Sequence, residues 1–168
     1  NHPKMPPIYL IMGVSGSGKS TIGRALSART DLPFFDADDY HPAANVAKMA
    51  AGQPLNDDDR QPWLETLAAL LQKQTQNEEG AILACSALKD RYRSILEQDL
   101  REKPLLVYLK GSPELISARM QARTGHFMPP ALLASQFAAL EEPHDALIVS
   151  IDQSIDQIVA AILAGPPE

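Results

Sequence analysis

The sequence predicts an α/β fold in which a five-stranded parallel sheet carries helices on both faces. Short runs that are apolar throughout alternate with longer segments whose apolar residues recur at helical spacing. In addition, a glycine-rich segment directly follows the first apolar run, 8–12, and a helical pattern begins near residue 19. This succession of strand, tight turn and helix is typical of doubly wound sheets, whose ligands bind beyond the carboxyl ends of the strands.

The remaining elements follow from the same two patterns. Further strands are predicted at 33–35, 81–85, 105–109 and 146–151. Helices are predicted from about Asp57 to Gln74, after the third strand, after Ser112-Pro113 and through 155–162. The chain of 168 residues contains no repeat and no linker-like stretch. We therefore expect one domain, 1–168, whose core is formed by 8–36 and 81–168.

Composition narrows the class of protein. Fifteen basic and 21 acidic residues give a formal net charge of −6, which argues against nonspecific nucleic-acid binding. Cys85 is the single cysteine, so an internal disulfide and a cysteine-based zinc site are excluded. No apolar run is long enough to span a bilayer, and no signal peptide is visible. These features lead us to expect a cytoplasmic protein without a membrane partner.

The segment after the first strand has the phosphate-binding pattern G-x-x-x-x-G-K-[ST]. It consists of Gly13, Val14, Ser15, Gly16, Ser17, Gly18, Lys19 and Ser20, and Thr21 follows it. Glycines allow a tight turn whose N–H groups point at an anion, and the following helix adds its positive N-terminal end. Lys19 can reach the β- and γ-phosphates, and the Ser20 hydroxyl can bind Mg²⁺. We expect this segment and Thr21 to bind ATP.

Two carboxylates follow the second strand. Asp36 and Asp38 are two residues apart, so in an extended backbone both side chains point to the same side. One can hold Mg²⁺ with Ser20, and the other can orient or deprotonate an acceptor hydroxyl, as a small-molecule kinase requires. Because no acidic residue ends the third strand, Asp36 is the expected metal residue and Asp38 the expected base. The alternative is that these acids only solvate a loop and cap a helix.

Several cations lie where an anionic ligand would need them. Arg60 follows three aspartates at the start of the long helix, where a positive charge opposes the helix dipole. Lys89 begins the helix after the third strand. Arg119 and Arg123 share a helix face and precede a break at Thr124-Gly125, which suggests a lid over the nucleotide. For Lys89, Arg119 and Arg123 the alternative is a solvated surface position.

Together these segments resemble the bacterial gluconate kinases, within the shikimate-kinase-like and nucleoside-monophosphate-kinase-like P-loop enzymes. The resemblance rests on GVSGSGKS, DADDYHP, NVAKM, PLNDDDRQPWL, CSALKDRYR, YLKG and ARTGHFM, in that order. It implies transfer of a phosphoryl group from ATP to D-gluconate, giving 6-phospho-D-gluconate, with Mg²⁺ as cofactor and usually a homodimer. It also implies a helical acceptor region at about 37–75 and a lid at about 119–135.

The resemblance assigns the acceptor site by residue. The expected acceptor residues are Asp38, His41, Asn45, Lys48, Arg60, Lys89 and His126, and the expected catalytic residues are Lys19, Asp38 and Arg123. Asp39 stands where related chains often have an apolar residue, which leaves open which acid is the base. The D-x-D spacing favours Asp38.

Three alternatives compete with this assignment. A kinase of another small acceptor, such as shikimate or a nucleoside monophosphate, would share the fold and the phosphate loop. A GTPase-type switch should contain an N-K-x-D motif, and none is present. A nucleotide-binding regulatory module would show no acceptor-dependent release of ADP.

Overall fold

The computed structural model describes residues 5–122 and 130–165. Its five strands form one parallel sheet, as the sequence predicted, and their order in the sheet is β2-β3-β1-β4-β5. The strands are β1 (Ile8–Met12), β2 (Phe34–Asp36), β3 (Ala81–Ala84), β4 (Leu105–Lys110) and β5 (Leu147–Ser150). Because β3 and β4 pair with β1 on opposite sides, the strand order reverses at β1. A crevice for a ligand is expected at such a point, and the glycine-rich segment begins there.

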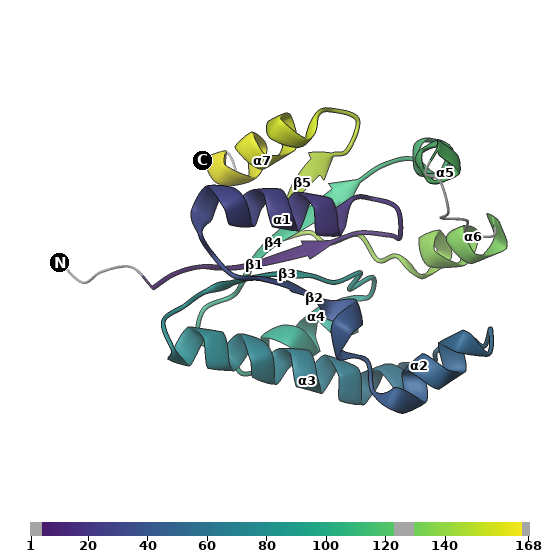
Figure 1. Cartoon of the computed structure of the whole chain (residues 1–168), viewed down its shortest axis with the longest axis horizontal. Helices are drawn as coiled ribbons and strands as arrows, with labels where there is room; N and C mark the ends of the chain where they lie inside the picture. The colour runs from purple at the N-terminus through teal and green to yellow at the C-terminus, as the bar shows by residue number, and fades with distance from the viewer. Residues whose placement is uncertain (1–4, 123–129, 166–168) are drawn as a thin grey trace.

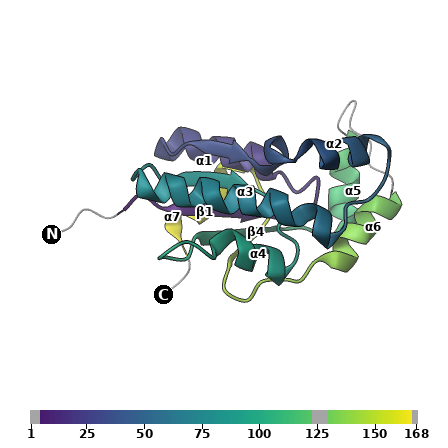
Figure 2. The same ribbon diagram turned by 90° about the horizontal axis from the view of Figure 1, so that it is seen from below.

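Helices cover both faces of the sheet. The α-helices are α1 (Lys19–Thr30), α2 (Ala43–Ala50), α3 (Asp57–Gln76), α4 (Asp90–Glu97), α5 (Pro113–Ala122), α6 (Pro130–Ala139) and α7 (Ile155–Ala164). Figure 1 shows α1 and α7 on one face, and α3 and α4 on the other. Helices α2, α5 and α6 lie beyond the carboxyl ends of the strands, as the view from below also shows (Figure 2). The connecting loops at that edge are therefore surrounded by three helices.

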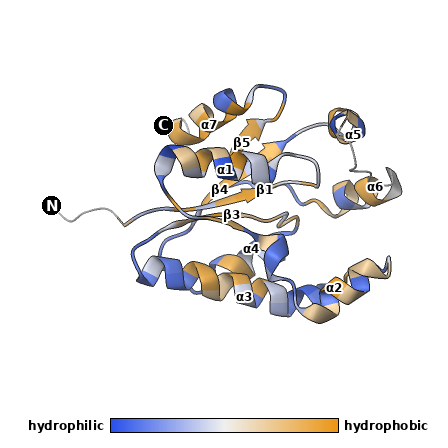
Figure 3. Cartoon of the chain, viewed as in Figure 1, coloured by the Kyte–Doolittle hydropathy of each residue, from blue (hydrophilic) through white to orange (hydrophobic). Residues whose placement is uncertain are grey.

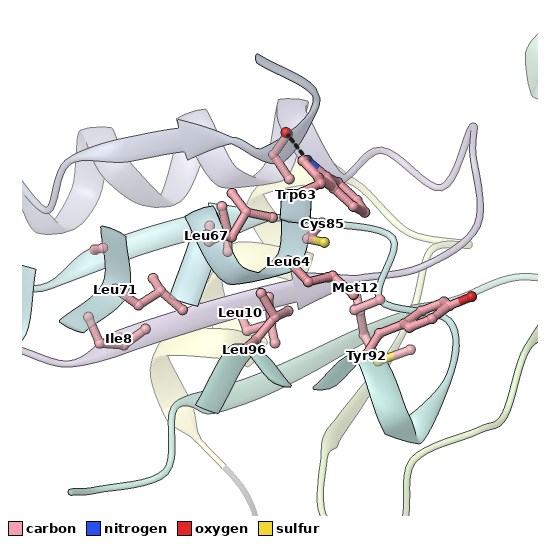
Figure 4. Close-up of a cluster of buried hydrophobic side chains, with 14 of the residues drawn as sticks. Ile8, Leu10, Met12, Trp63, Leu64, Leu67, Leu71, Cys85, Tyr92 and Leu96 are labelled. Carbon is pink, nitrogen blue, oxygen red and sulfur yellow. Dashed lines mark hydrogen bonds between the residues drawn. The ribbon is translucent and has the colours of Figure 1, made fainter. Parts of the chain in front are cut away.

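The core has two halves because side chains of a strand alternate between the faces of the sheet. Leu10 and Met12 pack toward α3 and α4, whereas Ile11 packs toward α1 and α7, and all three are fully buried. The strands are accordingly apolar, while α1, α3 and α4 combine hydrophilic with hydrophobic residues (Figure 3). Figure 4 shows the half that α3 and α4 cover. This packing fixes the carboxyl ends of β1, β2 and β3 side by side.

The long helix α3 agrees with the prediction, apart from its C-terminal end, which lies two residues further on. Asn56 is its N-cap: the side chain accepts a hydrogen bond from the Asp59 N–H, and the Asp59 carboxylate accepts one from the Asn56 N–H. This reciprocal arrangement satisfies two N–H groups that the helix itself cannot pair.

Two helices were not predicted as separate elements, although α2 lies within the 37–75 region that was expected to be helical. Helix α2 has eight residues, too few to show a clear period, and its contacts with the start of α3 are distant in sequence. Helix α6 is apolar at most positions, so its sequence shows no polar face. Among the described residues no helix combines the length and apolar character needed to cross a bilayer.

Candidate active site

The segment from Gly13 to Ser20 forms a loop between β1 and α1. Gly16 and Gly18 have φ values of 83° and 95°, which L side chains rarely adopt. Gly18 is the N-cap of α1 and provides no side-chain cap. The first N–H groups of α1 therefore face outward without intrahelical acceptors, together with the positive end of the helix dipole. This geometry suits a phosphate group.

Lys19 lies across this loop. Its Nζ donates to the carbonyl oxygens of Gly13 and Val14, at 3.0 and 3.1 Å. Desolvation lowers the pKa of Lys19, and the negative charges of Asp38 and Asp36 oppose that effect. The ammonium group is thus held at the loop, with two carboxylates close enough to affect it.

Ser20 and Asp36, the two residues expected to hold a metal ion, lie side by side. The Ser20 hydroxyl donates to Asp36 Oδ2 at 2.9 Å, and the other oxygen, Oδ1, accepts from the Asp38 N–H at 3.0 Å. A hydroxyl and one carboxylate are hard oxygen ligands of the kind that Mg²⁺ uses with water and substrate phosphates. The donor set fits Mg²⁺ bound with a nucleotide. Clusters of three or more metal-binding side chains do not occur among the described residues.

The extended backbone predicted at Asp38 is wrong. Asp36 ends β2, but residues Ala37–Tyr40 form a 3-10 helix, so the backbone is not extended at Asp38. The turn arises because the Asp36 side chain caps it. The two carboxylates nevertheless interact: burial and the charge of Asp36 raise the pKa of Asp38, while Lys19 and His41 act in the opposite direction.

Trp63 anchors this turn to α3. Its buried indole N–H donates to the Ala37 carbonyl oxygen at 2.7 Å, shown as a dashed line in Figure 4. The His41 ring stacks on the indole, with 4.2 Å between centroids and 14° between planes. Burial lowers the pKa of His41, and the charge of Arg60 acts in the same direction, whereas the charge of Asp38 opposes both. Asp38, His41 and Arg60 are therefore electrostatic neighbours.

Asn45 and Lys48, two predicted acceptor residues, join α2 to the start of α3 in this structure. Asn45 is buried; its Nδ2 donates to the Asp59 carbonyl oxygen at 2.9 Å and lies 3.3 Å from His41 Nδ1. Lys48 pairs with the Asp59 carboxylate at 2.5 Å. Both side chains hold the helical region in place, and their contact with an acceptor remains a prediction.

Arg60 and Lys89 converge on the carboxylate of Asp57, in the first turn of α3. Asp57 lies 3.5 Å from Lys89 Nζ, 3.2 Å from Arg91 Nη1 and 4.0 Å from Arg60 Nη1. It also accepts a short hydrogen bond from the Tyr92 hydroxyl, which in turn accepts one from Arg60 at 3.3 Å. We call these five residues the cation cluster. The hydrogen bond from Tyr92 and the neighbouring cations hold the pKa of Asp57 below its usual value.

The predicted lid lies partly within the described residues. Arg119 Nη2 donates to the Ile151 carbonyl oxygen at 2.6 Å, which joins α5 to the end of β5. Arg123 and His126 lie outside the described residues. Contacts of Arg119 with a nucleotide remain a prediction.

Four residues of this region were not identified from the sequence. Asp57, Arg91 and Tyr92 belong to segments used for the resemblance, but no local pattern reveals that α3 and α4 bring them together. Gln136 of α6 contacts Ser15 of the phosphate loop across 121 positions of sequence. A contact of that kind leaves no periodic or motif signal.

The fold and this site define a P-loop kinase, an enzyme that uses a nucleotide to phosphorylate another molecule. A family model described as shikimate kinase matches residues 15–163. The chain is 41% identical to the thermoresistant gluconokinase of Escherichia coli (strain K12), with 93% of this chain and 91% of that protein covered. It is 42% identical to a gluconokinase of Arabidopsis thaliana, and the match covers 93% of this chain and 90% of that protein.

A solved structure agrees with these relatives. The crystal structure of a gluconokinase from Sinorhizobium meliloti 1021 has a TM-score of 0.85 and 40% identity, and the match covers 97% of this chain and 93% of that one. The chain therefore belongs to the gluconokinase family. The family is not confined to bacteria, since a plant protein is among its members.

Proposed function

We propose that the protein transfers the γ-phosphoryl group of ATP to the C6 hydroxyl of D-gluconate, giving ADP and 6-phospho-D-gluconate. One observation carries the proposal. Asp38 is coupled electrostatically to both parts of the site: Lys19 of the phosphate loop and His41 both act on its pKa, and Arg60 of the cation cluster acts on that of His41. A base coupled to a phosphate site and to a set of cations suits an acceptor that has a hydroxyl at one end and a carboxylate at the other.

In this proposal the phosphate loop and Lys19 hold the ATP phosphates and stabilise charge that develops during transfer. Ser20 and Asp36 hold Mg²⁺, directly or through water. When bound there, Mg²⁺ supplies positive charge beside the transferred group. Asp38 orients the C6 hydroxyl and accepts its proton, for which a raised pKa is favourable.

The other end of gluconate meets the cation cluster. Arg60 and Lys89 bind the carboxylate, and the half-exposed Asp57 keeps these cations together before the acceptor arrives. His41, Asn45 and Lys48 of the 37–75 region provide hydrogen bonds for the hydroxyl groups. Arg119, together with Arg123, His126 and the rest of the 119–135 segment, closes over the transferred group.

Substitution of the cation cluster tests this proposal. Arg60→Ala and Lys89→Ala should each raise KM for gluconate about ten- to a hundredfold, because a charged partner of a carboxylate contributes about 1.5–3 kcal/mol. KM for ATP should stay close to the wild-type value. Arg29→Ala, in the last turn of α1, is the matched control and should leave both constants unchanged. Equal increases in KM for gluconate and KM for ATP would contradict the assignment of Arg60 and Lys89 to the carboxylate site.

A second acceptor class has one observation in its favour. The family model that matches the chain is described as shikimate kinase, and shikimate also combines hydroxyl groups with a carboxylate. The cation cluster alone does not discriminate between the two acids. Comparison of turnover on gluconate and shikimate distinguishes them.

We further propose a cytoplasmic homodimer. The requirement for ATP and an unpaired, buried thiol at Cys85 support a reducing compartment. Strand β5 is at the edge of the sheet and its Ile148 is 52% exposed; the unpaired backbone groups of an edge strand are suited to contact with a second copy of the chain. Light scattering should give twice the mass of the 18.3 kDa chain, and a monomer would exclude the dimer.

A further inference from the structure

The side chain of Gln136 joins helix α6 to the phosphate loop. The Ser15 N–H donates to Gln136 Oε1 at 2.7 Å, and Gln136 Nε2 donates to Ser15 Oγ at 3.0 Å. The two hydrogen bonds close a ring that includes the N–H and the hydroxyl of Ser15. Next to it, a Cβ atom on Gly16 would lie 2.7 Å from Met120 Cγ, so α5 also packs directly on the loop.

We propose that Gln136 is a positioning residue for the nucleotide, which acts by fixing Ser15 within the phosphate loop. The loop has two kinds of N–H group. Those of Ser15 and Ser17 are occupied by protein acceptors, Gln136 Oε1 and the Val14 carbonyl oxygen. Those of Gly16 and Gly18 have no acceptor among the described residues. Unpaired N–H groups in a glycine-rich loop are the donors that a phosphate needs.

The role of Gln136 is therefore to set which N–H groups are left for phosphate. Without its amide, the Ser15 N–H and hydroxyl lose their partners, and the loop can turn these groups toward solvent. The loop must then be reordered when the nucleotide binds, which weakens binding. Glutamine suits the position because one side chain both accepts from the N–H and donates to the hydroxyl.

This inference depends on nucleotide binding and not on the identity of the acceptor. It is therefore tested by calorimetric titration with ATP and Mg²⁺ in the absence of any acceptor. Failure of the gluconate proposal would leave the titration interpretable, because no acceptor takes part in it.

Two substitutions separate the components of the contact. Gln136→Glu keeps two acceptors for Ser15 but places a negative charge beside the phosphates, and it should weaken ATP binding about tenfold or more. Gln136→Met removes both hydrogen bonds while it keeps the length of the side chain. It should weaken binding about three- to tenfold, the range of one net hydrogen bond.

The matched controls are Gln76→Glu and Gln76→Met, at the exposed C-terminal end of α3, beyond the opposite edge of the sheet. They introduce the same chemical changes away from the loop and should alter ATP affinity less than twofold. Thermal unfolding of each variant measures folding separately. If Gln136→Met does not fold, Ser15→Ala, which removes only the hydroxyl contact, takes its place.

A double substitution tests whether Gln136 acts through Ser15. Ser15→Ala combined with Gln136→Met should bind ATP no more weakly than Gln136→Met alone. If the two substitutions weaken ATP binding independently, so that their fold-losses multiply in the double variant, the proposal is overturned. Wild-type affinity of Gln136→Glu for ATP would also overturn it. Tighter ATP binding by Gln136→Met would also overturn it, since the contact would then compete with the nucleotide.

Discussion

Trp63→Phe should weaken the fold and the acceptor site together. In the wild-type protein the indole N–H donates to the Ala37 carbonyl oxygen, and both residues are almost fully buried. Phenylalanine keeps an aromatic ring in the core but has no donor. The Ala37 carbonyl then remains buried without this partner at the start of the turn that carries Asp38.

The expected loss of stability follows from two contributions. A buried polar group left without a partner costs about 1–3 kcal/mol. The smaller ring leaves unfilled space, which adds about 1 kcal/mol. The free energy of unfolding should thus fall by about 2–4 kcal/mol, which for a domain of this size lowers Tm by about 5–12 °C. The turn and His41 also lose their support, so KM for the acceptor should rise while ATP affinity stays unchanged.

Calorimetry and steady-state kinetics with each substrate varied measure these effects. His41→Ala is the matched control because it removes the stacked ring and keeps the indole hydrogen bond. It should lower the free energy of unfolding by only about 0.5–1.5 kcal/mol. A Trp63→Phe protein as stable as His41→Ala, with wild-type KM for the acceptor, would refute the view that the indole hydrogen bond holds the turn in place.

Three further predictions concern ionisable groups. Asp36→Asn should lose activity that high Mg²⁺ partly restores, whereas Asp38→Asn should lose roughly 10²–10⁴-fold in kcat at any Mg²⁺ concentration; the reverse pattern in a Mg²⁺ titration would exchange their roles. The raised pKa of Asp38 means that the folded state binds its proton more tightly than the unfolded state. The wild-type protein thus loses stability as the pH rises from 3.8 through the raised pKa of Asp38. Asp38→Asn should therefore have a higher Tm than the wild-type protein at neutral pH, and no higher Tm below pH 3.8. An equal Tm of the two proteins at neutral pH would contradict this prediction. Burial raises the pKa of Cys85 to about 12. A thiol reagent should therefore modify Cys85 in urea but not in the folded protein. Rapid labelling of the folded protein would contradict this, because it would show that the thiol is accessible.

Local patterns were sufficient to predict most of the fold. The apolar strands and the glycine-rich loop depend on neighbouring residues, so the parallel sheet and the position of Lys19 could be expected from the sequence. Ser20 was expected beside Asp36 because Asp36 follows the second strand and no acidic residue ends the third, and the two side chains do form a hydrogen bond.

The rest depends on tertiary contacts. Asp38 was assigned an extended backbone because the alternation of polar residues does not reveal that Asp36 caps a 3-10 turn. Asp57 and Tyr92 form a hydrogen bond only because α3 and α4 pack side by side. The contact of Gln136 with Ser15 requires α6 to lie at the carboxyl edge of the sheet, which no local propensity determines.

Turnover on a panel of acceptors is the most direct test of the central claim. The purified protein is given ATP and Mg²⁺ with gluconate, glucose or shikimate, and ADP release is measured together with the identity of the phosphorylated product. Gluconate should be converted rapidly to 6-phospho-D-gluconate, and glucose, which lacks the carboxylate that Arg60 and Lys89 would bind, slowly or not at all. Faster turnover on shikimate or glucose than on gluconate would contradict the account.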